Sequence, residues 1–515
     1  MAQTTDARST TRAIALAALL IALGNIASRA LGLVREATIA FFFGRGSAVD
    51  AFTLAWTIPN TIYDLLINGA VSAALVPVLS EYAEGDADEF GRVVASIFTL
   101  ALACLCGLLA LAAWQAPLLT ALLVQADQPA LRTQTTELVR LLLPAVLLMG
   151  LSGLITAVLH ARRTFLWPAF GGAIFNGGMI VAMVLLHDQI GVSSLAIGAL
   201  IGAAGQVLVQ LSGLRGVRLR VGLRLRHPAV RRILLLYAPV ALGISFSILG
   251  TVIDRWLASG MPSAPTTMRY ATTLIQFPLG LVAAAVALAV LPTLSRQSAT
   301  GDEQAFRTTL AMGLKVVILL IVPATLGLAA LAEPLVALVL QRGAFIASDS
   351  AATATALRYY LPGLPAAALD QVLLFAFYAR KNTLTPNLVQ GAAIGFYLLT
   401  ALPLLLLSQL GFLALVLGNS AQWVGHALLL WWLLRRSVPL GGLRLGEAAL
   451  KALGAGLAMA AAVGGLAWLL RDLPLIAIIG LAGGAGAAIY MGLSALLKVE
   501  ALGFFLGAVA RRMGR

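Results

Sequence analysis

The sequence has few charged side chains for its length. Only 11% of its 515 residues are charged, 60% are hydrophobic, and the mean hydropathy is +0.95. A soluble globular protein carries about 25% charged residues, so these values exclude an ordinary soluble protein. They indicate a polytopic membrane protein.

Cysteine and histidine are also scarce, which argues against a metal or redox centre. Cys104 and Cys106 are the only cysteines, and on a helix two residues apart their side chains point to different sides. We expect both thiols to be buried and inert. The four histidines are scattered: His160, His187, His227 and His426. No His-x-x-x-His or Cys-x-x-Cys spacing and no phosphate-binding glycine loop occurs, so the sequence predicts no enzyme, no cofactor and no metal site.

Basic residues outnumber acidic ones, with 35 Lys and Arg against 21 Asp and Glu and a formal net charge of +14. They stand in short segments between apolar runs, which argues against a nucleic-acid partner. If the N-terminus is cytoplasmic, the outer segments hold only Arg45, Arg132, Arg342 and Arg471. The basic clusters then lie on the inner side, so the positive-inside rule places both termini in the cytoplasm and requires an even number of spans.

Apolar runs of about 20 residues dominate the sequence, and each is long enough to form one membrane-spanning helix. Fourteen such runs begin near residues 13, 50, 93, 134, 167, 190, 230, 268, 308, 351, 387, 411, 445 and 474. The sequence therefore predicts an all-α polytopic membrane protein with about fourteen transmembrane helices.

Polar and proline positions repeat along the chain. Arg140–Pro144 (Arg-Leu-Leu-Leu-Pro) recurs as Arg358–Pro362 (Arg-Tyr-Tyr-Leu-Pro), 218 residues later. Pro77–Ser80 (Pro-Val-Leu-Ser) recurs as Pro292–Ser295 (Pro-Thr-Leu-Ser). Both copies of each motif fall on the same side of the membrane, so two parallel repeats are related by an axis along the membrane normal, a plan that transporters use. The alternative is chance similarity between apolar sequences.

The repeats predict the organisation of the chain. They give a six-helix N-terminal lobe at 13–213, a basic cytoplasmic linker at 214–232, a six-helix C-terminal lobe at 233–436, and two extra C-terminal transmembrane helices at 445–497. Prolines interrupt apolar runs in both lobes: Pro59, Pro77, Pro144, Pro278, Pro292, Pro362 and Pro365. Such breaks permit bending, so we expect the lobes to rock.

One candidate site lies on the first apolar helix. Six residues fall within an arc of about 120° on this helix. They are Asn25, Ser28, Arg29, Gly32, Arg35 and Glu36. An arginine near the bilayer centre costs about 2.5–3.5 kcal/mol, so it persists mainly where it faces water, a partner charge or an anionic substrate. The stripe is interpreted as the wall of a cavity. In the alternative interpretation, Arg29 and Glu36 pair with other helices and Arg35 extends to the interface.

Few other charges lie within the apolar runs. Asp254 and Arg255 are adjacent in the seventh run, where they form either a structural ion pair or part of a coupling site. Asp254 and Glu36 are the candidate coupling residues.

Four arginines have the chemistry of an anion site. Arg29, Arg35, Arg255 and Arg269 would together line a cationic chamber suited to a diphosphate, because arginine offers planar, bidentate donors. Such a chamber favours an anionic amphiphile as substrate.

Several longer motifs occur along the chain. They are Ser28–Glu36 (Ser-Arg-Ala-Leu-Gly-Leu-Val-Arg-Glu), Leu75–Tyr82 (Leu-Val-Pro-Val-Leu-Ser-Glu-Tyr), Asp254–Ser259 (Asp-Arg-Trp-Leu-Ala-Ser), Phe277–Gly280 (Phe-Pro-Leu-Gly) and Arg342–Phe345 (Arg-Gly-Ala-Phe). Together they extend over nearly the whole chain and resemble the MurJ (MviN) family of lipid II flippases.

The resemblance implies the fold of the multidrug/oligosaccharidyl-lipid/polysaccharide exporter superfamily, with a central cationic cavity and a lipid-tail groove beside the last two helices. It also implies alternating-access transport of undecaprenyl-diphosphate-linked peptidoglycan precursor from the inner to the outer leaflet of the bacterial cytoplasmic membrane. Arg29 and Arg35 match first-helix arginines that hold the diphosphate in this family, and Asp50 matches its essential acid.

Two positions depart from the family pattern. Tyr63 and Asp64 stand where many members carry a basic pair. Thr273 replaces the third cavity arginine, for which Arg269, four residues earlier on the same helical face, is a candidate substitute.

Three functional hypotheses follow. The leading one is a lipid II flippase in which Arg29, Arg35, Asp50, Arg255 and Arg269 bind the substrate. The second is an exporter of another polyprenyl-linked glycan; a cationic drug would require carboxylates in the chamber instead. The third is a non-transporting scaffold for envelope assembly, which predicts that replacing Arg29 or Arg35 leaves function intact. The expected partners are the lipid-linked precursor, membrane lipids, and a coupling ion or the membrane potential.

Overall fold

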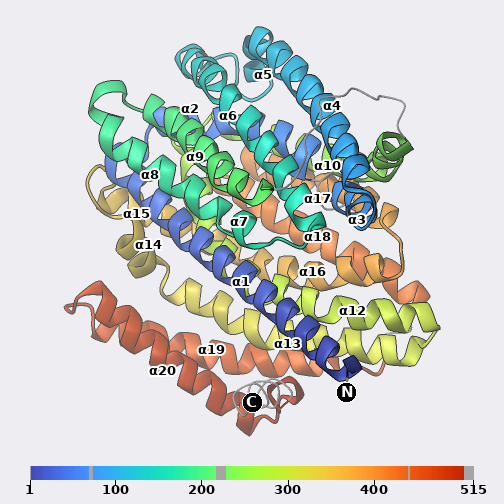
Figure 1. The fold of residues 1–515 in the computed structure, drawn as a ribbon. Coiled ribbons are helices and arrows are strands. Elements are labelled where there is room, and N and C mark those ends of the chain that lie inside the picture. The colour runs from blue at the N-terminus through green and yellow to red at the C-terminus, as the bar shows by residue number, and fades with distance from the viewer. Residues whose placement is uncertain (1, 69–73, 216–227, 439–440, 504–515) are drawn as a thin grey trace. The chain divides into compact units, whose positions relative to one another are not determined.

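The protein consists of helices joined by short turns (Figure 1). The computed structural model describes residues 2–68, 74–215, 228–438 and 441–503, and these ranges contain no β-strand. The elements up to the middle of the chain are α1 (Ala2–Phe43), α2 (Ser47–Tyr63), the π-helix η1 (Asp64–Asn68), α3 (Val76–Ala83), α4 (Ala87–Trp114), α5 (Ala116–Ala121), α6 (Pro129–Ala161), α7 (Leu166–Ala169), α8 (Gly171–Ile190), α9 (Ser193–Leu211), the 3-10 helix η3 (Ser212–Leu214) and α10 (Pro228–Ser259).

The remaining elements begin with α11 (Ala264–Pro278), the π-helix η4 (Leu279–Ala283), α12 (Ala284–Thr300), α13 (Glu303–Ala330), α14 (Ala332–Leu340), α15 (Ala347–Tyr360) and the 3-10 helix η5 (Leu361–Gly363). They end with α16 (Leu364–Ala379), α17 (Leu384–Leu407), α18 (Leu413–Ser437), α19 (Leu445–Leu469) and α20 (Leu475–Leu496). The chain forms two compact units, Met1–Thr266 and Thr267–Arg515, and the boundary falls within α11.

The helices fit a membrane protein, which confirms the predicted fold class. Among the described residues, eleven helical segments are long and apolar enough to span a membrane, and twelve if the bent α10 counts as one span. α10 bends by 50° between Ala238 and Gly243. α1 and α2 correspond to two further predicted apolar runs. The count of fourteen transmembrane helices remains a prediction.

Each unit contains a π-helical segment next to a proline. η1 follows Pro59 by a few residues in the first unit, and η4 directly follows Pro278 in the second. The two segments lie 215 residues apart, which is also the separation of Pro77 and Pro292 in the repeated motif. Proline removes a backbone hydrogen bond from a helix, and single π-turns occur frequently at functional sites. Both units therefore carry a local distortion at the same position of the repeat.

The second helix after each distortion, α4 in the first unit and α13 in the second, begins in the same way. Asp86 accepts a hydrogen bond from Asp88 N at the start of α4, at 3.1 Å, and Asp302 accepts one from Ala305 N at the start of α13, at 2.9 Å. A carboxylate is a favourable N-cap because it accepts from N–H groups that have no partner within the helix. α4 and α13 both have 28 residues.

The arginines of the repeated Arg-x-x-Leu-Pro motif also make equivalent contacts. Arg140 Nε donates to Ala113 O near the end of α4, and Arg358 Nε donates to Ala329 O near the end of α13, both at 3.3 Å. A cation at a helix C-terminus interacts favourably with the last carbonyls and the helix dipole. The equivalent arginine therefore joins α6 to α4 in the first unit and α15 to α13 in the second.

Close helix packing inside the first unit depends on glycine. α8 and α9 lie side by side (Figure 1), and a Cβ at Gly202 would lie 2.4 Å from Phe175 O. Any side chain at this position would push the two helices apart. This pair holds α8 in place, which in turn packs against α1.

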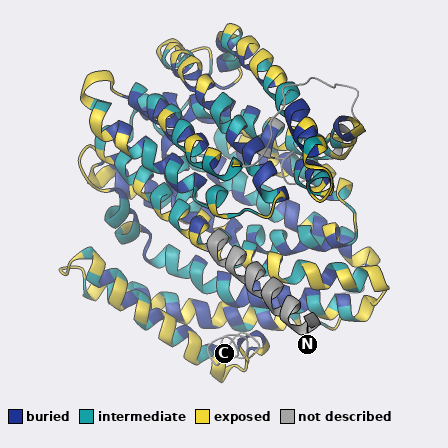
Figure 2. Cartoon of the chain, in the orientation of Figure 1, coloured by how far each residue is buried: buried dark blue, intermediate teal, exposed yellow. Residues whose placement is uncertain are grey.

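The prediction that the cysteines are buried is wrong. Cys104 and Cys106 are both exposed, whereas Leu105 and Leu109 of the same helix, α4, are buried. Large hydrophobic side chains such as Leu111 and Leu118 are exposed as well. In a protein with membrane spans, exposed apolar residues face lipid rather than water, so a small apolar thiol is stable on the outer surface of a helix. Figure 2 shows exposed positions along the outer helices α19 and α20.

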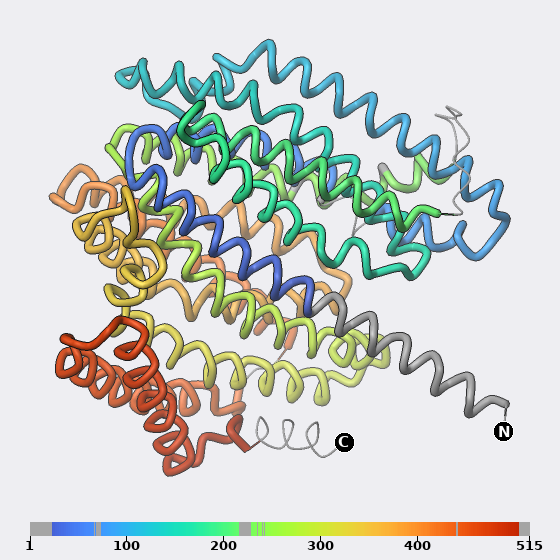
Figure 3. Tube along the Cα trace, turned by 60° about the vertical axis from the view of Figure 1, so that its left-hand side comes forward, coloured from blue at the N-terminus to red at the C-terminus, as the bar shows by residue number. Residues whose placement is uncertain are grey.

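The predicted lobes, 13–213 and 233–436, and the two extra helices at 445–497 remain predictions. Most of the basic linker at 214–232 lies outside the described residues. In the last part of the chain, α19 and α20 form an antiparallel pair whose two helices run side by side (Figure 3).

Candidate functional site

The polar face of α1 contacts α8 through one asparagine. Arg35 Nη2 donates to Glu36 Oε1 at 2.6 Å, and Arg35 Nη1 donates to Asn176 Oδ1 at 2.9 Å. Asn176 Nδ2 in turn donates to Ser28 O at 3.0 Å. Asn176 and Glu36 are buried, so this network is fixed within the first unit. The Arg35 guanidinium is thereby held in one orientation with its charge partly balanced.

The two arginines of the stripe have different surroundings. They stand at opposite edges of the predicted arc, about 120° apart. Arg35 lies at the edge that faces α8 and retains 23% of its side-chain exposure, whereas Arg29 is exposed. The structure therefore brings Ser28 and Arg35 together with Asn176, and it places Arg29 on an accessible face of the helix.

Asp50 lies in the first turn of α2 and is only 4% exposed. Its Oδ2 accepts a hydrogen bond from Ser263 N at 2.8 Å. Its Oδ1 accepts bonds from Thr266 N at 3.0 Å and Thr266 Oγ1 at 2.6 Å. Ser263 Oγ also donates to Arg45 O at 3.1 Å. The backbone N–H groups and the helix dipole favour a negative charge at a helix N-terminus. Asp50 therefore caps the N-terminus of α11, although it lies 213 residues before Ser263 in the chain.

The adjacent pair on α10 is a contact without a close hydrogen bond. Arg255 Nη1 lies 3.7 Å from Asp254 Oδ2, and both side chains are mostly buried. Nη1 of Arg255 is buried and makes no hydrogen bond to any described residue. An incompletely bonded guanidinium favours an additional acceptor, such as an anionic oxygen.

Arg269 belongs to the second unit and is partly buried on α11. Thr273 Oγ1 donates to Arg269 O at 2.9 Å, and Thr272 Oγ1 donates to the same carbonyl at 3.0 Å. Thr273 therefore satisfies its hydroxyl within its own helix. The assignment of Arg269 to a shared cationic chamber stays a prediction.

Sequence reasoning missed the partners of the predicted residues. Asn176, Ser263 and Thr266 carry no charge, and each lies more than 100 residues away from the residue to which it bonds. An asparagine in the middle of an apolar run is the one signal that would have indicated Asn176, because an amide in lipid needs partners. Within the described ranges, no group of three or more His, Cys, Asp or Glu side chains is placed to hold a metal ion.

The arrangement of helices matches known transporters. A solved lipid II flippase MurJ in an inward closed conformation superposes with a TM-score of 0.79 at 22% identity, covering 93% of this chain and 98% of that one. An inward-facing MATE-family multidrug transporter of the MOP superfamily gives a TM-score of 0.65 at 12% identity, covering 82% and 96%. The protein is therefore a multi-pass membrane protein with the fold of this class of transporters.

Sequence comparisons define the family. The family model for lipid II flippase MurJ matches residues 39–475. A lipid II flippase MurJ of Burkholderia cenocepacia is 32% identical over 392 residues, which cover 73% of this chain and 75% of the relative. A probable lipid II flippase MurJ of Treponema pallidum is 29% identical over 438 residues, or 81% of each chain. The chain belongs to the MurJ lipid II flippase family.

Proposed function

We propose that this protein moves lipid II, the undecaprenyl-diphosphate-linked peptidoglycan precursor, from the inner to the outer leaflet by alternating access. The observation that carries this proposal is the family match over residues 39–475, which includes Asp50 and most of the helices. In this proposal the protein is a transporter and not an enzyme. Its partners are the lipid-linked precursor, membrane lipids, and a coupling ion or the membrane potential.

Arginines would bind the diphosphate. Arg29 is exposed, and Arg35 is oriented by Glu36 and Asn176, so the first helix offers one accessible and one preorganised guanidinium. Arg255 has a buried N–H group without a hydrogen bond among the described residues, which supports it as a further phosphate ligand. Arg269 completes the proposed set. Arginine suits this task because its donors match two phosphate oxygens at once.

Asp50 has a different role in this proposal. Both of its carboxylate oxygens are occupied by hydrogen bonds to Ser263 and Thr266, so in this conformation it has little capacity to bind a substrate. We infer that Asp50 is a latch that joins α2 to the start of α11. Transport by alternating access would require such a latch to open and close in each cycle.

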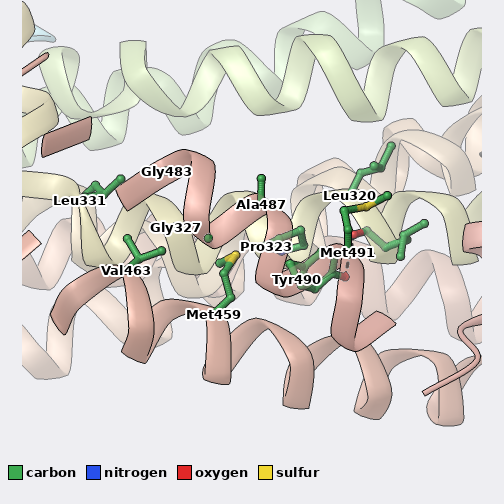
Figure 4. A pocket seen from close by; sticks show the side chains of 12 residues that line it. Leu320, Pro323, Gly327, Leu331, Met459, Val463, Gly483, Ala487, Tyr490 and Met491 are labelled. Carbon is green, nitrogen blue, oxygen red and sulfur yellow. Dashed lines mark hydrogen bonds between the residues drawn. The ribbon is translucent and has the colours of Figure 1, made fainter. Parts of the chain in front are cut away.

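An apolar cavity supports binding of the lipid tail. A cavity of about 290 Å³ lies between α13, α19 and α20 in the second unit (Figure 4). Its walls include Leu320, Pro323, Met459, Val463 and Met491. The Tyr490 hydroxyl donates to Leu319 O at 2.8 Å, so the polar atom on this wall is already satisfied. A prenyl chain would replace lipid contacts here with packing against protein at no cost in polar groups.

The proposed setting is the bacterial cytoplasmic membrane, with both termini in the cytoplasm. The arginine distribution supports this orientation through the positive-inside rule. For coupling, Asp254 and Glu36 remain candidates, because both are buried acids within membrane helices.

The decisive experiment measures binding of purified protein to lipid II and to an undecaprenyl-diphosphate sugar that lacks the peptide. Wild type is compared with Arg29→Ala/Arg35→Ala and with Val34→Ala, an exposed change on the same helix outside the polar stripe. We expect lipid II binding in wild type and the control, and its loss in the double variant.

The other outcomes separate the competing functions. Equal binding of both lipids would favour an exporter of polyprenyl-linked glycans in general. Lipid II transport that survives in the double variant would refute the arginine site, and absence of any binding by folded wild type would favour a scaffold.

A further inference from the structure

A buried histidine and an aspartate meet between two membrane helices of the second unit. His426 on α18 lies with Nδ1 2.7 Å from Asp370 Oδ1 on α16. The His426 side chain is 9% exposed and that of Asp370 is 19% exposed. None of the proposed steps of lipid binding uses either residue.

The position of the pair is deep in its helix. His426 is the fourteenth of the 25 residues of α18, and the nearer helix end, Ser437, lies about 16 Å away at 1.5 Å per residue. Ionisable side chains are expensive at such depth, and they are typical of ion and proton pathways. The pair therefore requires an explanation beyond packing.

The equivalent helix contact in the first unit carries a neutral pair. Asp370 lies 218 residues after Ser152, the same separation as the repeated Arg-x-x-Leu-Pro motif. Ser152 Oγ, on α6, donates to Gln210 Oε1, on α9, at 3.0 Å, and both residues are buried. A serine and a glutamine are thus sufficient to join these two helices. At this helix contact, the described residues of the first unit form a neutral pair and those of the second unit a titratable one.

Other titratable groups on the helices that pack against α16 and α18 are few. On the elements that contact α18 they are Tyr378, Tyr397, Asp349, Arg358, Tyr359 and Tyr360. On α12 and α13, which contact α16, they are Arg296, Glu303, Arg307 and Lys315. Several of these are engaged elsewhere: Lys315 pairs with Glu500, Glu303 pairs with Arg380, and Arg358 donates to Ala329 O. Within the described ranges, Asp370 is the one charged group that pairs with the imidazole.

The chemistry of the pair suits reversible protonation. When Nδ1 donates to Asp370, a second proton binds at Nε2 and changes the net charge of the pair from −1 to 0. Nε2 is buried and makes no hydrogen bond to any described residue. The neutral imidazole leaves the carboxylate charge uncompensated, and the imidazolium leaves an N–H without an acceptor. Each form of the pair therefore leaves one group incompletely satisfied.

We propose that His426 and Asp370 form an intramembrane proton-binding site, which takes up and releases one proton as the transporter changes conformation. This inference rests on the proposed lipid transport for its cycle, but proton binding itself can be measured without lipid II.

The first test is direct. The sequence has four histidines, so 15N-histidine labelling of the full chain in lipid nanodiscs gives a simple nuclear magnetic resonance spectrum, in which His426→Gln identifies the signal. Over a pH series in which the protein stays folded, we expect the His426 signal to convert between imidazolium and imidazole. Asp370→Asn should shift the midpoint of this conversion. A His426 signal that stays in one form over the whole range would overturn the proposal.

The second test concerns transport. Proteoliposomes with the membrane potential clamped to zero are given a pH gradient, and lipid II flipping is measured for wild type, His426→Gln and Ser152→Ala. Glutamine offers a hydrogen-bond donor to Asp370 but no titratable group, so this variant separates hydrogen bonding from proton binding. Ser152→Ala disrupts the neutral pair and is the matched control.

In wild type and in the Ser152→Ala control, the pH gradient should change the flipping rate by at least about fivefold, which is the low end of ordinary coupling. In His426→Gln the change should be less than about twofold. An equal response of His426→Gln and wild type would overturn the proposal. Failure of wild type to bind lipid II, or to flip it when a membrane potential is applied, would instead refute the proposed function, whereas the spectroscopic result would still decide the proton site.

Discussion

The buried Asp50 carboxylate accepts three hydrogen bonds, from Ser263 N, Thr266 N and Thr266 Oγ1. An asparagine amide, which has one acceptor oxygen, cannot replace it. Asp50→Asn keeps one acceptor oxygen but turns an NH2 group toward an N–H donor from α11. Hydrogen bonds to charged groups contribute about 1.5–3 kcal/mol each, so we expect the free energy of unfolding to fall by about 2 kcal/mol. Reversible unfolding in lipid bicelles measures this change. Lipid II flipping should fall in the same variant.

Thr266→Val is the matched control for this latch. It removes the hydroxyl donor at 2.6 Å but keeps the backbone bond and the side-chain shape, so its effect should be about half as large. The affinity for lipid II distinguishes a latch from a substrate ligand. An Asp50→Asn protein that folds normally but binds lipid II at least tenfold more weakly would contradict the latch.

Asn176 gives a second prediction, about the orientation of Arg35. Asn176→Ala removes the acceptor that holds Arg35 Nη1 and the donor to Ser28 O. Loss of one such bond corresponds to about 1 kcal/mol, so lipid II affinity should fall by about fivefold, less than in Arg35→Ala. The dissociation constant measured in nanodiscs checks this result.

Asn176→Asp separates orientation from charge. The carboxylate still accepts from Arg35, but it adds a second negative charge beside Glu36 and competes with a phosphate. Binding should therefore be weaker than in Asn176→Ala. Affinity of Asn176→Asp equal to that of wild type would show that Arg35 does not contact the diphosphate.

Arg140 and Arg358 make equivalent contacts in the two units, so the effect of replacing one can be compared with the effect of replacing the other. Arg140→Gln removes one bond to the end of α4, Arg358→Gln removes one to the end of α13, and both arginines are exposed. Each should lower the free energy of unfolding by about 0.5–1 kcal/mol, and the double variant by the sum, because the sites belong to different units. Glu137→Gln, an exposed change one turn before Arg140, is the control and should have an effect within about 0.5 kcal/mol.

Elements were easier to predict from the sequence than contacts between them. Apolar length located the helices, and the Asp86 and Asp302 caps repeat because each depends on a few neighbouring residues. The bonds of Asp50 to Thr266 and of His426 to Asp370 join residues 216 and 56 positions apart. No local pattern encodes such pairs, since they depend on which helix faces lie against each other.

The exposure of the cysteines shows the same limit. An apolar residue in a membrane helix can face either protein or lipid, and hydropathy alone does not separate the two. Leu105 is buried and Cys104 beside it is exposed because α4 presents only one side to its neighbours.

For the whole molecule, parallel repeats require that equivalent turns of the two halves lie on the same side of the membrane. Ala130 and Ser348 are equivalent by the offset of 218 residues, and both are exposed near the starts of α6 and α15. Glu89 and Gln304 are exposed in the first turns of α4 and α13, which are expected on the other side of the membrane. In a background of Cys104→Ala and Cys106→Ala, each of the four positions is changed to cysteine in turn.

An impermeant maleimide added to intact cells should label Ala130→Cys and Ser348→Cys, and it should label Glu89→Cys and Gln304→Cys only after the membrane is opened. The reason is that the arginine distribution places the starts of α4 and α13 on the cytoplasmic side in both halves. Labelling of Ala130→Cys but not Ser348→Cys would mean that the halves are inverted relative to each other. In that case two parallel lobes could not rock about one axis along the membrane normal, and the proposed mode of alternating access would fail with them.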